Sequence, residues 1–76
     1  MNVSNETLLR DIENTEKEVL AYNKLSEGFG LLSELPEFNQ YKRRDYEEKS
    51  LNYANLAEGC MQFLDQLLSI KSDRKL

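Results

Sequence analysis

Along two stretches of this 76-residue chain, residues suited to a helix interface recur at alternating steps of four and three. Such spacing is the heptad pattern of paired helices. The first stretch has an apolar series with polar residues at two positions: Leu8, Ile12, Thr15, Val19, Tyr22, Ser26 and Phe29. The second stretch has Tyr46, Tyr53, Ala57, Cys60, Leu64 and Leu67. One break separates them, from Gly28 to Pro36, because glycine weakens a helix interior and proline disfavours helix in the residue before it. The sequence therefore predicts two helices packed along this seam.

We predict an all-α fold, an antiparallel two-helix hairpin that forms one domain over residues 1–76 and is oligomeric or part of a hetero-complex. The first helix is expected over about residues 4–33, the connector over about 34–37 and the second helix over about 38–71. The charges favour the antiparallel arrangement. The first forty residues hold eight acidic and three basic side chains, whereas the remainder holds six acidic and seven basic ones.

Local signals mark the expected helix ends. Asn2 and Ser4 are both candidate caps for the first helix, because their side-chain oxygens can accept an unpaired backbone N–H. Gly28 and Gly30 are expected to stop or kink that helix. Pro36 suits the first turn of the second helix, where its missing N–H would be unpaired anyway.

The chain has more apolar helix surface than one seam can use. At about 100° per residue, the seam and the lines beside it cover roughly 160° of the second helix, whereas a helix facing a single neighbour needs about 100°. Exposed apolar patches of this kind usually mark interaction sites. The residues expected to bind a partner are Leu9, Leu20 and Leu31, spaced by eleven, and Leu56, Phe63, Ile70, Met61 and Leu68, in two lines spaced by seven.

Reactive groups are scarce, so we expect no enzyme activity, no cofactor and no metal. Histidine is missing, Cys60 is the only cysteine, and neighbouring carboxylates such as Glu47 and Glu48 lie on polar helix faces. On the apolar seam the Cys60 thiol should have a raised pKa and no base to activate it. Gly28-Phe29-Gly30 lacks the preceding strand and longer glycine pattern of a phosphate-binding loop.

The net charge of -4 argues against nucleic acid as a partner, because such binders need a positive field. No apolar run is long enough for a membrane span, and the first ten residues lack the pattern of a signal peptide. We therefore expect a cytoplasmic protein that does not bind membranes.

The second helix resembles a known family in Gln40-Tyr41, the charged stretch after it, Ala54, Ala57, and the pairs Cys60-Met61 and Phe63-Leu64. In these features the chain is similar to the small co-chaperones of type III secretion needles (YscE-like proteins), over about residues 5–71. The resemblance implies a hairpin that pairs with a larger helical-repeat chaperone. Together the two would hold a needle subunit unpolymerised in the cytosol before export.

Three hypotheses about function follow. The first is a helper that acts by covering apolar helix surface, as a chaperone or co-chaperone of a secretion-apparatus subunit. Its partner would be a helical chaperone, a secretion subunit or a second copy of itself. The second is a small phage or sporulation-type regulator that inhibits a protein target by docking on it. The third is a nucleic-acid-binding hairpin that uses Lys42, Arg43 and Arg44, with Tyr41 and Tyr46 beside them.

Overall fold

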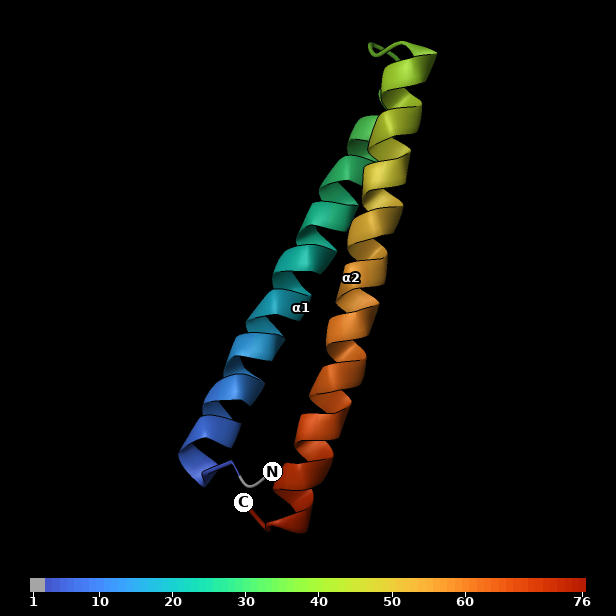
Figure 1. Cartoon of the computed structure of the whole chain (residues 1–76). Helices are drawn as coiled ribbons and strands as arrows, with labels where there is room; N and C mark the ends of the chain where they lie inside the picture. Colours follow the sequence, from blue (N-terminus) through green and yellow to red (C-terminus); the bar gives the residue numbers. More distant parts are fainter. Residues whose placement is uncertain (1–2) are drawn as a thin grey trace.

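A computed structural model describes residues 3–76 of the chain, which form two long helices side by side (Figure 1). Helix α1 spans Asn5–Ser33 and helix α2 spans Gln40–Asp73. The chain reverses direction between them, so the start of α1 and the end of α2 lie at the same end of a rod that measures 52 × 15 × 15 Å. The predicted all-α, two-helix hairpin is confirmed. Within residues 3–76, no helix combines the length and the apolar character that crossing a bilayer requires.

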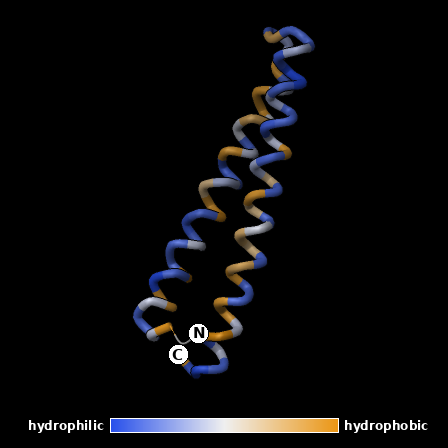
Figure 2. Tube along the Cα trace, viewed as in Figure 1, coloured by the Kyte–Doolittle hydropathy of each residue, from blue (hydrophilic) through white to orange (hydrophobic). Residues whose placement is uncertain are grey.

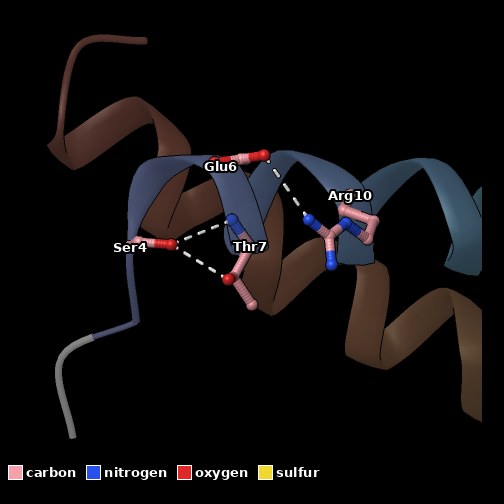
Figure 3. Close-up of polar contacts among 4 residues, drawn as sticks. All are labelled: Ser4, Glu6, Thr7 and Arg10. Atoms are coloured by element: carbon pink, nitrogen blue, oxygen red, sulfur yellow. Dashed lines mark hydrogen bonds and ion pairs between the residues drawn. The ribbon is translucent and has the colours of Figure 1, made fainter.

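Each helix begins at a side-chain cap. The hydroxyl oxygen of Ser4 accepts a hydrogen bond from the backbone N–H of Thr7 at 3.1 Å (Figure 3). In α2, the side-chain oxygen of Asn39 accepts from the backbone N–H of Lys42 at 2.8 Å. Both caps satisfy a backbone donor that the first helical turn leaves unpaired. Of the two candidate caps for the first helix, Ser4 is the one used, and Asn2 lies outside the described residues.

The break between the helices is shorter than the glycines suggested. The glycines were expected to stop or kink the first helix, whose predicted range was about 4–33; α1 continues through Gly28 and Gly30 to Ser33, so they do not stop it. Neither glycine has a positive φ angle, and the contacts of α1 with α2 outweigh the low helix propensity of glycine. Pro36 falls within the predicted connector of about residues 34–37, but it does not stand in the first turn of α2. It lies in the connector, residues 34–39, because Asn39 supplies the capping side chain that starts α2.

The predicted seam forms the interface between the two helices, and its residues are buried or half-buried. Near the termini it is apolar, where Leu8, Ile12 and Leu67 form the core and Leu64 packs against them. Leu8 has no exposed surface, and Ala57 and Thr15 are also buried. The Thr15 hydroxyl donates to the backbone oxygen of its own helix four residues earlier, at 2.7 Å, so burial leaves it satisfied.

Towards the connector, the seam becomes aromatic. Tyr22 stacks on Tyr53 with 6.1 Å between ring centroids, and Phe29 stacks on both Tyr53 and Tyr46 at 5.6 and 5.9 Å. Phe38 of the connector meets the Tyr46 ring edge-on at 5.3 Å. These contacts place the middle of α1 opposite the first half of α2 and extend the packed interface to the end of the hairpin.

A polar layer interrupts the aromatic contacts. The Ser26 hydroxyl donates to the backbone oxygen of Ser50 at 2.8 Å, and the Ser50 hydroxyl donates to the backbone oxygen of Ser26 at 2.7 Å. Small side chains let the helices approach closely here. A Cβ atom added to Gly30 would lie 3.3 Å from the Ser50 hydroxyl oxygen, a tight contact. By contrast, a Cβ added to Gly59 would meet nothing within 4 Å, so Gly59 does not mark a close approach within the hairpin.

Candidate protein-binding surfaces

The hairpin exposes more surface than a compact protein of its mass. Its accessible area is 5916 Å², whereas a folded monomer of 8.9 kDa is expected to expose about 4,800 Å². Its radius of gyration is 16.8 Å, against about 11 Å for a compact domain of this length. A single pair of helices has no third layer to cover its sides. Figure 2 shows that apolar residues recur along both helices as far as their ends.

All eight residues predicted to bind a partner have large exposed side chains in the structure. The exposed fraction ranges from 37% for Ile70 to 60% for Leu31. The seam therefore leaves each of them accessible to another polypeptide. They do not all lie together, and they divide between two sides of the hairpin and its outer surface.

One side, which we call the charged flank, consists of the residues that come just before alternate seam positions. On α1 these are Asp11, Glu18, Leu25 and Leu32, and on α2 they are Lys42, Lys49, Leu56, Phe63 and Ile70. Two contacts show that residues of α1 and α2 meet along this flank. The Cys60 thiol donates to the Glu18 carboxylate across the seam at 3.7 Å, and the Lys49 ammonium lies 5.7 Å from the centre of the Phe29 ring.

The opposite side, which we call the methionine flank, consists of residues that come just after alternate seam positions. They are Leu9, Glu16 and Asn23 on α1, and Ala54, Met61 and Leu68 on α2. Leu20 lies one position further round α1. Beside it a shallow groove with a volume of about 500 Å³ is lined by Val19, Leu20 and Leu64, with Glu13, Glu16, Lys17 and Asn23 around them. The methionine flank is therefore apolar near the termini and hollowed between the helices.

The eleven-residue line on α1 does not stay on one flank. Leu9 follows the buried Leu8 and lies on the methionine flank, whereas Leu31 lies two positions past Phe29, on the outer surface of α1. The interface follows a seven-residue period, and an eleven-residue period drifts away from it. Leu9 and Leu20 can therefore contact one partner together, while Leu31 faces away from α2.

Leu25 and Leu32 belong to the charged flank but were absent from the predicted set. They line a shallow groove of about 200 Å³ together with Phe29, and Leu25 is 43% exposed. Leu25 comes just before Ser26 of the predicted seam, and Leu32 comes just before Ser33, seven residues further on. The place of Ser26 in the seam and the seven-residue spacing of the two leucines could have revealed them.

The thiol of Cys60 is half-buried in the seam. Desolvation raises the pKa of the thiol above its ordinary value, and the hydrogen bond to Glu18 and the negative charge of that carboxylate raise it further. A raised pKa keeps the sulfur protonated and weakly nucleophilic. The geometry agrees with the prediction of an unreactive seam thiol.

The basic cluster near the connector is used partly within the hairpin. The Arg43 guanidinium donates to the backbone oxygen of Ser33 at 3.1 Å, and the Lys42 ammonium lies 5.2 Å from the centre of the Phe38 ring. Arg44 lines a small surface hollow next to the acidic Glu47. Within residues 3–76, no group of three acidic, cysteine or histidine side chains is placed to hold a metal ion.

No protein-family model, curated protein or solved structure matches the chain. The resemblance to needle co-chaperones therefore stays a prediction, and the class of protein is defined by the fold: a two-helix hairpin with two exposed apolar flanks.

Proposed function

We propose that this chain is a protein-binding helper that covers apolar helix surface on a partner, as a chaperone or co-chaperone of a secretion-apparatus subunit does. The supporting observation is that large apolar side chains stand exposed on both sides of a hairpin that has no third element to cover them. The methionine flank is the better site for a foreign helix. Met61 and Leu68 are 50% and 38% exposed there, and methionine adapts to varied apolar surfaces.

The mode of binding would be that of one helix lying along the flank. An amphipathic partner helix would place its apolar side chains over Leu9, Met61 and Leu68, which lie near the termini of the hairpin. Such a partner would itself expose an apolar stripe when alone. Covering that stripe prevents self-assembly, which is the role that the resemblance implies towards a needle subunit.

The test is recovery of the partner from the native host with two matched variants as bait. Met61→Asp/Leu68→Asp places two charges on the methionine flank, and Asn52→Asp/Asn55→Asp places two charges on the outer surface of the same helix. We expect the wild-type chain and the outer-surface variant to recover the same protein, and the flank variant to lose it. Equal recovery by both variants would contradict the proposed surface.

The identity of the recovered protein separates the two protein-binding hypotheses. A helical chaperone or a secretion subunit that stays unpolymerised in the presence of the chain supports the helper. An enzyme or polymerase whose activity falls when the chain is added supports the inhibitory regulator instead.

A further inference from the structure

The methionine flank has carboxylates beside its apolar side chains. Residues three apart on a helix lie on the same face, so the residues three positions before members of the flank border it on the side away from the seam. The six residues in this position are Glu6, Glu13 and Leu20 on α1, and Leu51, Glu58 and Asp65 on α2. All six are exposed. The four acids among them, which we call the acidic border, therefore flank the apolar part of the surface on both helices.

The negative charge of this surface is only partly compensated within the hairpin. Glu6 and Glu13 each form an ion pair with a basic residue four positions later, at 3.6 and 3.3 Å, the first of which is drawn in Figure 3. Exposed pairs of this kind are weak and can be exchanged for others. Within residues 3–76, Glu16, Glu58 and Asp65 form no ion pair. Uncompensated carboxylates thus remain on both helices.

Glu16 lies inside the groove of the methionine flank and constrains what can bind there. The groove places its carboxylate among the apolar side chains of Val19, Leu20 and Leu64. A helix bound along the groove would take this carboxylate out of water, which is strongly unfavourable unless a cation pairs with it. A helix with a wholly apolar stripe therefore fits poorly, whereas a helix with lysine or arginine beside its stripe fits well.

We infer that the methionine flank binds a cationic amphipathic helix, whose apolar stripe has lysine or arginine along both edges. The stripe covers Leu9, Met61 and Leu68, and the basic side chains pair with Glu16 and the acidic border. From Ala54 to Leu68 the flank is about 21 Å long, so a helix of about 14 residues spans it. This inference rests on the proposed function and specifies the chemistry of the partner.

The charged flank does not offer the same match to a cationic helix. Lys42 and Lys49 lie in line on that flank and would repel basic side chains near the connector. The carboxylate of Glu18 already accepts a hydrogen bond from the Cys60 thiol. An anionic membrane surface is in turn a poor occupant of the methionine flank, because the acidic border repels it.

The test is binding of labelled synthetic peptides to the purified full chain, followed by fluorescence anisotropy. A lysine-edged peptide of about 18 residues, long enough for about 27 Å of helix, has a leucine stripe with lysines on both edges. A glutamate-edged peptide has glutamates in place of the lysines, and a scrambled peptide has the lysine-edged composition without a stripe. We expect the lysine-edged peptide to bind at least about tenfold more tightly than either, a difference of about 1.4 kcal/mol. Equal binding of the three peptides would overturn the inference.

Two matched variants locate the binding site. Glu16→Gln/Asp65→Asn removes two negative charges from the methionine flank and its border, and Glu37→Gln/Glu48→Gln removes two from the connector and the outer surface of α2. All four residues are exposed, and circular dichroism reports whether each variant keeps its helices. The first variant should bind the lysine-edged peptide at least about fivefold more weakly, and the second within about twofold of the wild-type chain. Equal weakening would show that net charge alone attracts the peptide and would overturn the site.

A charge reversal tests the recognition in the opposite sense. Glu16→Lys/Asp65→Lys should reduce the preference for the lysine-edged over the glutamate-edged peptide at least about tenfold, because two attractive contacts become repulsive. An unchanged preference in a variant that keeps its helices would contradict the inferred contacts.

Two further measurements distinguish other occupants. Vesicles of phosphatidylglycerol and phosphatidylcholine should not bind the chain, and binding that Met61→Asp/Leu68→Asp abolishes would assign the flank to a membrane instead. A wild-type dimer that the same variant dissociates in sedimentation equilibrium would assign the flank to a second copy. Either result would overturn the inference. Recovery of a host protein through the methionine flank, without preference for the lysine-edged peptide, would leave the proposed function standing and overturn only the cationic chemistry.

Discussion

Replacement of Leu8 by alanine should remove a large part of the stability of the hairpin. Leu8 has no exposed surface and packs in the core with Ile12 and Leu67. The substitution removes three carbon atoms, which at about 0.8 kcal/mol each corresponds to about 2.4 kcal/mol of lost burial. The cavity left behind adds to this, and buried Leu→Ala changes cost about 2–5 kcal/mol. We expect about 2.5–3 kcal/mol, because this core lies near the open end of the hairpin, where the helices can partly close the gap.

This loss is large relative to the whole. A domain of this length is stable by about 4–11 kcal/mol, so Leu8→Ala should lower the midpoint of thermal unfolding by about 10–20 °C. Leu31→Ala is the matched control, since Leu31 is 60% exposed on the outer surface of α1. It should change the free energy of unfolding by no more than about 0.5 kcal/mol.

The measurement is urea unfolding followed by helical circular dichroism, at a concentration where sedimentation shows a single species. That condition matters because dimerisation would add to the apparent stability. Equal losses for Leu8→Ala and Leu31→Ala would refute the position of the core. A loss below about 1 kcal/mol at Leu8 would show that the leucine is much less buried than the structure has it.

Three further outcomes are expected. Gly28→Ala should raise the free energy of unfolding by about 0.8–1 kcal/mol in urea titrations, because the new methyl group meets open space. Gly30→Ala should raise it by less, because its methyl group would crowd the Ser50 hydroxyl. Ser4→Ala should lower the same free energy by about 1 kcal/mol and increase amide exchange in the first turn of α1, because the cap hydrogen bond is lost. The rate at which iodoacetamide modifies Cys60 should depend on pH with an apparent pKa above the ordinary 9.0. Glu18→Gln should lower that pKa and speed the reaction at a given pH. An unchanged dependence of the rate on pH would contradict the contact between Cys60 and Glu18.

The seam could be predicted from sequence because its physical cause is periodic. Leu8 and Ile12 on α1 and Leu67 on α2 each occupy a position of the heptad pattern. Pairing the two helices along that pattern buries these side chains. The helices were predicted over about residues 4–33 and 38–71, and the observed bounds are Asn5–Ser33 and Gln40–Asp73. The expected stop at Gly28 and Gly30 rested on a local propensity of about 1 kcal/mol per glycine, which the contacts between the helices can exceed.

The candidate surfaces were predictable in part. Exposure of Met61 and Phe63 follows from having more apolar lines than one seam can cover. The membership of each flank does not follow, because it depends on which polar residues complete the seam. Ser50 occupies a seam position of α2 that the predicted seam left out. Without Ser50, the sequence does not show which residues of α2 lie on the same flank as Leu25 and Leu32 of α1.

The reciprocal hydrogen bonds of Ser26 and Ser50 have a consequence for the alignment of the two helices. Apolar side chains tolerate sliding, because one leucine fits about as well as another against a neighbouring turn. A hydroxyl bonded to a particular carbonyl does not. Moving α2 along α1 by one turn, 5.4 Å, would take both hydroxyls away from their acceptors at once. The register of the hairpin is therefore fixed chemically near the connector, which keeps the charges and apolar side chains of each flank at constant heights.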